Sequence, residues 1–222
     1  AGMKARSTSL NDQLGLVESV LSDKTGTLTE NRMTFARCAI AGETFTADQL
    51  RAALKRCGVD ATRQTPVVVD VVPPDDAPPC APQAPPPARD DPAPPPAAYE
   101  DLRDVLLCMA LCNAVTVQNG TYGSPSPDET ALYETALGLN VEILRRNQKL
   151  AVLRVFGAEE RFSVLATFPF DSARKRMGVL LRDAAGVVTL WEKGADNVIA
   201  ARAVNADGAL GAVDAFSGDG LR

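Results

Sequence analysis

The second half of the sequence is dominated by short apolar segments that are separated by turn residues. Five of them follow Leu139, namely Val141–Leu144, Lys149–Val155, Phe162–Phe168, Met177–Arg182 and Val187–Trp191. Short runs rich in β-branched and aromatic residues are typical of strands. The polar stretch at 183–186, which ends in glycine, is typical of a hairpin connection. Because strands joined by hairpins pair antiparallel, the sequence predicts an antiparallel sheet.

Helices are predicted on both sides of this strand region. Apolar residues recur at helical spacing near 101–117 and 128–138, and a further short helix is expected near 195–203. These helices would cover one or more faces of the sheet, which defines an α+β fold. Ser126 is a candidate N-cap, with Pro127 at the first helical position and Glu129 at the third, a capping-box arrangement. Glu129 would then return its carboxylate to the start of its own helix.

The residues before this region predict a smaller set of elements. Two short strands, 33–40 and 43–46, would flank the turn at Ala41-Gly42. Thr46 is placed to cap a short helix near 47–57.

A proline-rich stretch interrupts the chain between these two parts. Thirteen of the 16 prolines fall between Pro66 and Pro96, interspersed with alanine and aspartate. Proline cannot donate a backbone hydrogen bond, and this composition buries little apolar surface. Residues 63–98 are therefore predicted to form a mobile, partly polyproline-like insert. A ligand for an SH3-type domain is the alternative interpretation of this stretch.

Composition limits the possible partners and chemistry. A net charge of −5 with interspersed signs gives no electrostatic reason to expect nucleic-acid or anionic-membrane binding. No apolar stretch approaches the roughly 18 to 20 residues that span a bilayer, and no signal peptide is recognisable. Five cysteines without a CxxC pair favour reduced thiols in the cytosol. The absence of histidine excludes a Ser-His catalytic pair.

The motif Asp23-Lys24-Thr25-Gly26-Thr27-Leu28-Thr29 follows the apolar run 17–21, which is predicted to be a strand. An aspartate at the tip of a strand lies where open α/β sheets bind ligands. The lysine, the hydroxyls and the backbone N–H groups that follow could surround a phosphoryl group. Such an aspartate could attack a γ-phosphate and carry it as an aspartyl-phosphate.

This motif resembles the phosphorylation signature of the P-type ATPases, within the haloacid-dehalogenase-like class. The resemblance implies that Asp23 is the nucleophile, that Lys24 offsets the charge on the phosphoryl group and that Thr25, together with Asp23, holds Mg²⁺. Thr25 occupies the position where many hydrolytic members carry a second aspartate. The phosphorylated form is therefore expected to persist, which suits a transport cycle.

A second motif, Phe168-Pro169-Phe170-Asp171-Ser172-Ala173-Arg174-Lys175-Arg176-Met177, places aromatic rings beside three consecutive cations. Aromatic rings stack on bases and cations neutralise phosphates, although composition alone favours a core aromatic and solvated cations. The pattern resembles the ATP pocket of phospholipid flippases. The resemblance implies that Phe170 stacks on adenine, that Ser172, Lys175 and Met177 line the pocket, and that Phe168 belongs to the core.

Three further segments are similar to the same family. Lys193-Gly194 matches its KGA motif, where the lysine lies at the pocket floor and the glycine allows the backbone to approach the ligand closely. The resemblance assigns Glu129 to the exocyclic amine of adenine, beside its capping interpretation. Gly220-Leu221-Arg222 resembles the segment whose arginine contacts the ATP phosphates.

The chain is thus identified as a fragment of a type-IV P-type ATPase. The resemblance implies a flexible leader over 1–12, the first strand of the phosphorylation domain and the hinge over 13–32, and the nucleotide-binding domain over 33–222. It implies ATP and Mg²⁺ as cofactors, phospholipid as the transported substrate and, in the intact protein, a possible accessory β subunit. The intact protein would lie in a membrane, with these domains on the cytosolic face. The fragment alone is expected to bind nucleotide weakly and to be inactive.

Three alternatives stay open. An ion pump of another P-type branch would share Asp23 and Lys193 but not the segments around Glu129 and Phe170. A soluble haloacid-dehalogenase-like phosphatase would not be expected to carry Thr25 in the acid position. A non-catalytic nucleotide-binding or Pro-rich interaction module is the third.

Overall fold

The computed structural model describes residues 15–24, 27–29, 32–61, 97–118, 121–204 and 206–221. The chain divides into two units, residues 1–32 and residues 33–222, and each is described by itself. Several predictions fall outside the described residues: the leader at 1–12, Thr25, the Pro-rich insert up to residue 96, and Arg222.

The strand that was expected to deliver Asp23 is not present. Residues 17–21 have no regular secondary structure, and the side chains of Val17, Val20 and Leu21 are 51%, 81% and 99% exposed. A strand is stabilised by backbone hydrogen bonds to a neighbouring strand. No strand among the described residues pairs with residues 17–21, and this explains why the segment is not a strand.

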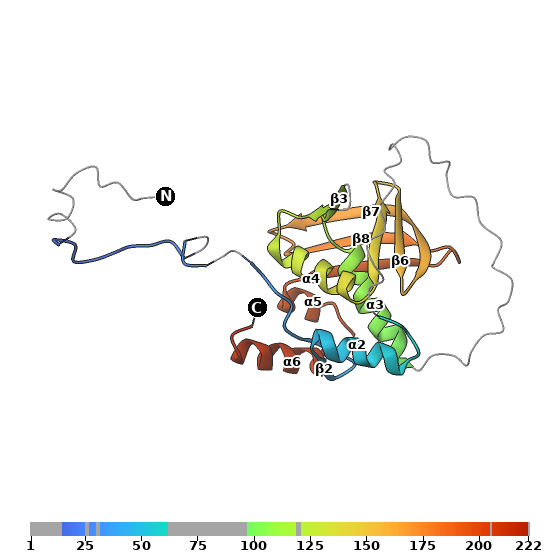
Figure 1. Ribbon diagram of the computed structural model, residues 1–222, viewed down its shortest axis with the longest axis horizontal. Coiled ribbons are helices and arrows are strands. Elements are labelled where there is room, and N and C mark those ends of the chain that lie inside the picture. The colour runs from blue at the N-terminus through green and yellow to red at the C-terminus, as the bar shows by residue number, and fades with distance from the viewer. Residues whose placement is uncertain are drawn as a thin grey trace, which may run out of the picture. The chain divides into compact units, whose positions relative to one another are not determined.

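The second unit is built around a five-stranded antiparallel sheet, as predicted (Figure 1). Its strands follow one another in chain order: β5 (Val141–Arg146), β6 (Leu150–Val155), β7 (Ala158–Asp171), β8 (Arg176–Arg182) and β9 (Val188–Gly194). Each pairs with the next through a short connection. Between β8 and β9, Asp183 donates its N–H to Val187 O at 3.0 Å and Gly186 adopts φ +86°.

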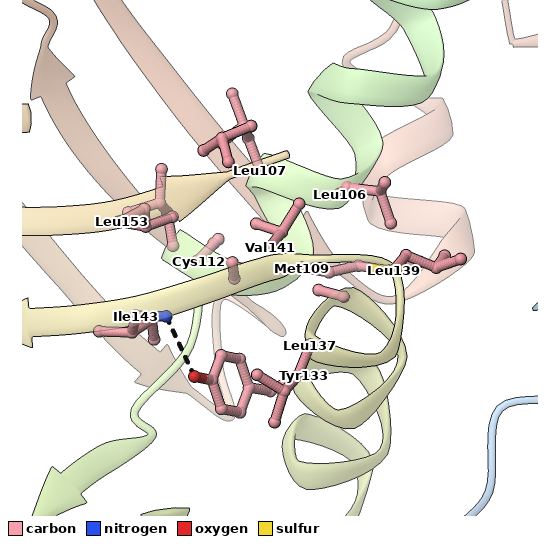
Figure 2. Close-up of a cluster of buried hydrophobic side chains, with 14 of the residues drawn as sticks. Leu106, Leu107, Met109, Cys112, Tyr133, Leu137, Leu139, Val141, Ile143 and Leu153 are labelled. Atoms are coloured by element: carbon pink, nitrogen blue, oxygen red, sulfur yellow. Dashed lines mark hydrogen bonds between the residues drawn. The ribbon is translucent and has the colours of Figure 1, made fainter. Parts of the chain in front are cut away.

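Helices α3 (Ala97–Leu111) and α4 (Pro127–Gly138) lie against the sheet (Figure 1). Their apolar residues and the inward residues of the strands form one core, part of which is drawn in Figure 2. Central members are at most 2% exposed, among them Leu106, Leu107, Val141, Ile143 and Leu153.

Helix α3 begins and ends earlier than the predicted range 101–117. It includes Ala97 and Ala98, which were assigned to the insert, and alanine is the strongest helix former. It ends at Leu111 because the side chain of Asn113 donates to Met109 O and Ala110 O, both at 2.8 Å. The chain then forms a hairpin of β3 (Thr116–Gln118) and β4 (Thr121–Gly123).

The first elements of this unit match their predictions. Strands β1 (Cys38–Ile40) and β2 (Glu43–Phe45) form a hairpin, although β1 is shorter than predicted. Helix α2 (Ala47–Arg56) begins with a capping box: Gln49 N–H donates to Thr46 Oγ1 at 3.3 Å, and Thr46 N–H donates to Gln49 Oε1 at 2.7 Å.

Two helices follow the sheet. Helix α5 (Asp196–Ala200) matches the short helix expected after β9, whereas α6 (Asp207–Gly218) was not predicted. The end of α6 is tied to the chain just before β1. Arg37 Nη2 donates to Asp219 Oδ2 at 2.5 Å, and the same guanidinium lies 5.2 Å from the ring centre of Phe216.

The phenol of Tyr133 links α4 to the sheet, as the dashed line in Figure 2 shows. Tyr133 is 1% exposed, and its hydroxyl oxygen accepts the N–H of Ile143 at 3.1 Å, beside a bulge in β5. Tyr133→Phe removes this acceptor inside the core. Because an unpaired buried donor costs about 1–3 kcal/mol, the free energy of unfolding is expected to fall by that amount. Chemical denaturation measures it.

Tyr122→Phe is the matched control, since the hydroxyl of Tyr122 donates to Glu134 Oε1 at 3.2 Å in an exposed position. Water can replace that bond, so the expected loss is within about 0.5 kcal/mol. Equal losses for the two variants would contradict the role given to Tyr133.

Candidate functional site

An ion pair joins the start of α4 to the end of β9. Lys193 Nζ lies 2.9 Å from Glu129 Oε1, and the two side chains are 25% and 10% exposed. The residues are 64 positions apart in the chain. A charged pair that is sheltered but still reachable from solvent is a candidate for a binding site.

The second carboxylate oxygen of Glu129 is also occupied. Ala114 N–H donates to Oε2 at 2.9 Å, and Ser124 Oγ donates to it at 2.8 Å. Burial raises the pKa of Glu129, but the bonds from Lys193, Ala114 and Ser124 outweigh it, so this pKa is lowered. Glu129 is thus held ionised.

The capping prediction for α4 is half right. Ser126 is the N-cap, and its hydroxyl accepts the N–H of Glu129 at 3.4 Å. The Glu129 carboxylate does not return to the N–H of Ser126, which instead donates to Ser124 Oγ at 3.2 Å. The Glu129 carboxylate therefore does not cap its own helix and bonds instead to Lys193, Ala114 and Ser124.

Phe170 lies at the same end of the sheet as Lys193. Asp171 of β7 is opposite Arg176 of β8, which in turn is opposite Gly194 of β9. Phe170 and Lys193 are thus near one another in register, two strands or ~10 Å apart. Phe170 is 63% exposed, which leaves its ring available to a ligand.

A bulge in β7 decides which way Phe170 points. Phe168 is opposite Gly178 and Asp171 is opposite Arg176, so β7 carries one extra residue between these pairs. Because side chains alternate along a strand, Phe170 falls on the face opposite to Asp171 and Arg176. Met177 and Lys193 form the next cross-strand pair, on that same face.

The prediction that Phe168 belongs to the core is wrong. Phe168 is 41% exposed, and its partner Gly178 offers no side chain to cover it. Phe168 shares its face with Glu192, the other cross-strand partner of Gly178, and α3 and α4 pack on the opposite face. Met177, by contrast, is 4% exposed and belongs to the core directly across from Lys193.

Gly194 also has a structural role that was not predicted. A Cβ at this position would lie 2.6 Å from the carbonyl oxygen of Lys175 and 2.6 Å from the Cβ of Arg176. The backbone that approaches Gly194 is therefore the turn before β8.

That turn carries two of the predicted site residues. Ser172 and Lys175 are both exposed, and Lys175 adopts φ +51°. Asp171 closes the turn, accepting the N–H groups of Ala173 at 2.7 Å and Arg174 at 3.1 Å. These bonds lower the pKa of Asp171.

Asp23 and Lys24 belong to the first unit and are exposed. The carbonyl of Lys24 accepts the N–H of Leu28 at 3.0 Å and the hydroxyl of Thr29 at 3.4 Å, so local hydrogen bonds join the described residues of the motif. Thr25 and Arg222 lie outside the described residues.

Sequence reasoning missed the residues that surround the pair. Ala114 acts through its backbone N–H, which no sequence pattern marks. The roles of Asn113 and of Arg146, which donates to the Asn113 side chain, were also missed. For Ser124, the one available signal was its position just before Pro125-Ser126, the start of the segment that contains Glu129.

No second candidate site was found among the described residues. A cavity of about 240 Å³ lies between α2, α3 and the β1–β2 hairpin and contains none of the predicted site residues. The described residues contain no cluster of three or more cysteine and acidic side chains that could hold a metal. None of the helices in the described ranges combines the length and apolar composition needed to cross a bilayer.

Comparison with known proteins identifies the family. Residues 101–206 match the family model for the P-type ATPase, cytoplasmic domain N. Phospholipid-transporting ATPase IK of Mus musculus is 36% identical over 203 residues, which is 90% of this chain and 14% of the relative. Phospholipid-transporting ATPase IC of Homo sapiens is 32% identical over 201 residues, 88% of this chain and 15% of the relative.

The chain thus spans about one seventh of the length of these relatives. The match to the domain N model covers most of α3, all of α4, the five-stranded sheet and the Glu129–Lys193 pair described above. The chain therefore belongs to the type-IV P-type ATPases.

Proposed function

We propose that this chain binds ATP at the end of the sheet where Phe170, Glu129 and Lys193 meet. The observation that supports it most is the pair of Lys193 and Glu129, brought together from 64 positions apart. The register of β7, β8 and β9 adds Phe170, an exposed ring on the face of Lys193.

Each of the three side chains fits one part of the nucleotide. The face of Phe170 can stack on adenine. The ionised Glu129 can accept the exocyclic amine of the base once Lys193 turns outward, and the released ammonium can neutralise phosphate charge. Ser172 and Lys175 of the adjoining turn and Gly194 of β9 would line this site, and Arg222 would contact the phosphates.

In the whole protein, ATP held here would phosphorylate Asp23. An oxygen of Asp23 attacks the γ-phosphorus, the bond to the β-phosphate oxygen breaks, and ADP leaves with an aspartyl-phosphate remaining. The ammonium of Lys24 would offset the charge on the transferring group. The relatives carry the name phospholipid-transporting ATPase, so we infer that this cycle moves phospholipids across a membrane, with the two units on its cytosolic face.

Mg²⁺ would accompany the nucleotide. Asp23 and Thr25 would hold it, since Mg²⁺ is usually bound by one or two protein oxygens together with substrate phosphates and water. When bound, it neutralises charge on the phosphate oxygens. An exposed Asp23 carboxylate fits this ligand.

Phe170→Ala is expected to weaken ATP binding about tenfold or more, because losing an aromatic stack on a base costs about 1–3 kcal/mol. Lys193→Ala is expected to weaken it similarly by removing the cation. Isothermal titration of the 222-residue chain with ATP measures both.

Phe168→Ala is the matched control: the same residue type, two positions away on β7, partly exposed and on the other face of the sheet. The affinity of the Phe168→Ala variant for ATP is expected to stay within about twofold of that of the unaltered chain. Equal losses at Phe168 and Phe170, or a folded chain that binds no ATP, would contradict the proposal.

A further inference from the structure

Asn113, directly after α3, is 2% exposed, and its carboxamide uses every hydrogen-bonding position that it has. Nδ2 donates to Met109 O and Ala110 O, both at 2.8 Å. Oδ1 accepts the N–H of Val115 at 3.0 Å and Nη1 of Arg146 at 2.8 Å. Two donors and two acceptor positions are the full capacity of this group.

These bonds fix the backbone on both sides of Ala114. The carboxamide satisfies two carbonyls at the end of α3, which would otherwise lack intrahelical partners, and it also holds the N–H of Val115. Ala114 lies between these anchors, and its N–H donates to Glu129 Oε2 at 2.9 Å. The orientation of that N–H is therefore set by Asn113.

Asn113 also holds a cation near Glu129. Arg146, the last residue of β5, is partly buried, and none of the ion pairs among the described residues includes it. Burial lowers its pKa, while the nearby Cys112 sulfur and the negative charge of Glu129 oppose that change. A neutral amide oxygen thus fixes this guanidinium, which forms no ion pair with Glu129.

We propose that Asn113 is a positioning residue for the Glu129–Lys193 site. It presents the Ala114 N–H to Oε2 and fixes Arg146, whose charge acts on the carboxylate without an ion pair, so that Oε1 is the oxygen left for Lys193 or a ligand amine. The geometric part stands on the contacts above, and its consequence for ATP affinity rests on the nucleotide site proposed in the preceding section.

Asn113→Ala is expected to raise the midpoint of the Glu129 titration by about one pH unit, because one charge-assisted hydrogen bond is lost and the cation is released. Carbon-13 NMR of glutamate side-chain carboxyls follows this titration, with Glu129→Gln to assign the signal. ATP affinity measured by calorimetry is expected to fall about three- to tenfold.

Asn140→Ala is the matched control. Asn140 lies just beyond α4, with φ +65°, and its Nδ2 donates to Asp60 O at 3.2 Å. This variant also loses an asparagine bonded to backbone at a helix end, but it is expected to leave the Glu129 midpoint unchanged. A purely structural role for Asn113 would make the two variants alike.

Arg146→Met keeps the proposal testable if Asn113→Ala does not fold. It removes the cation, leaves the other three bonds of Asn113 in place, and is expected to raise the Glu129 midpoint by a smaller amount. A Glu129 midpoint that is unchanged in the folded variant overturns the proposal. If the unaltered chain binds no ATP, the nucleotide site fails, yet the Glu129 titration still decides the role of Asn113.

Discussion

Gly194→Ala is expected to destabilise the second unit by about 1–3 kcal/mol or more. The added Cβ would lie 2.6 Å from Lys175 O and 2.9 Å from the Cα of Arg176, so backbone rather than a flexible side chain has to move. For a domain of this size the melting temperature is expected to fall by about 5 °C or more. Differential scanning calorimetry measures it.

The same substitution is expected to weaken ATP binding. Gly194 pairs with Arg176, and Lys193 pairs with Met177, so separating these strands moves the ammonium away from Glu129. A shift of about 1 Å in a positioned group is enough to lose much of its effect. Titration with ATP under conditions where the variant remains folded separates this loss from unfolding.

Gly211→Ala is the matched control. Gly211 lies inside α6 and is exposed, and a Cβ there would meet nothing within 4 Å. Alanine is the better helix former, so this variant is expected to gain about 0.5–1 kcal/mol. If Gly194→Ala were equally harmless, the close approach of the two backbones would be disproved.

The sheet was predictable because the residues that specify each strand and turn are close together in the sequence. Alternating apolar residues and turns such as 183–186 mark each strand of an antiparallel meander, and every strand there pairs with its sequence neighbour. The segment 17–21 has a similar apolar pattern but no strand beside it among the described residues. Helix α6 lacked a signal, because its alanines and glycines show no clear apolar periodicity.

The candidate site was predictable only where side chains form motifs. Glu129, Phe170 and Lys193 were recognised by family resemblance, and the structure brings Glu129 and Lys193 into contact. Ala114 contributes a backbone N–H, a donor that every residue except proline possesses, so its identity carries no information. Asn113 lies in a segment, 110–113, that is similar to the family, but its role could not be predicted, because its partners are mostly backbone groups placed by the fold.

The structural role of Gly194 was missed, and Phe168 was assigned to the wrong environment. Both have their cause at the turn between β7 and β8. The turn brings Lys175 against Gly194, and the bulge before it puts Phe168 and Phe170 on opposite faces. A bulge adds one residue without changing the apolar pattern enough to be read from sequence.

Lys193→Met is expected to cost about 1–3 kcal/mol of unfolding free energy near neutral pH. Methionine keeps most of the apolar stem but leaves the ionised Glu129, whose side chain is 10% exposed, without its cation. Arg161→Met is the matched control: Arg161 Nη2 lies 2.9 Å from Glu159 Oε1, the same separation as in the Lys193 pair. Those side chains are 54% and 49% exposed, so the expected loss is below about 0.5 kcal/mol.

The dependence on pH distinguishes this explanation from a general packing defect. The pKa of Glu129 is lowered in the folded chain, so its contribution to stability is present above the unfolded value of about 4.3 and is lost as pH falls through the folded value. Lys193→Met removes one cause of that lowering. The difference from the unaltered chain is therefore expected to be full at pH 7 and to shrink on acidification, as Glu129 takes up a proton first in the variant and then in the unaltered chain. Urea denaturation of the two chains from pH 3 to pH 8 measures it. A difference that stays constant over this range would show that methionine harms packing rather than the charge balance around Glu129.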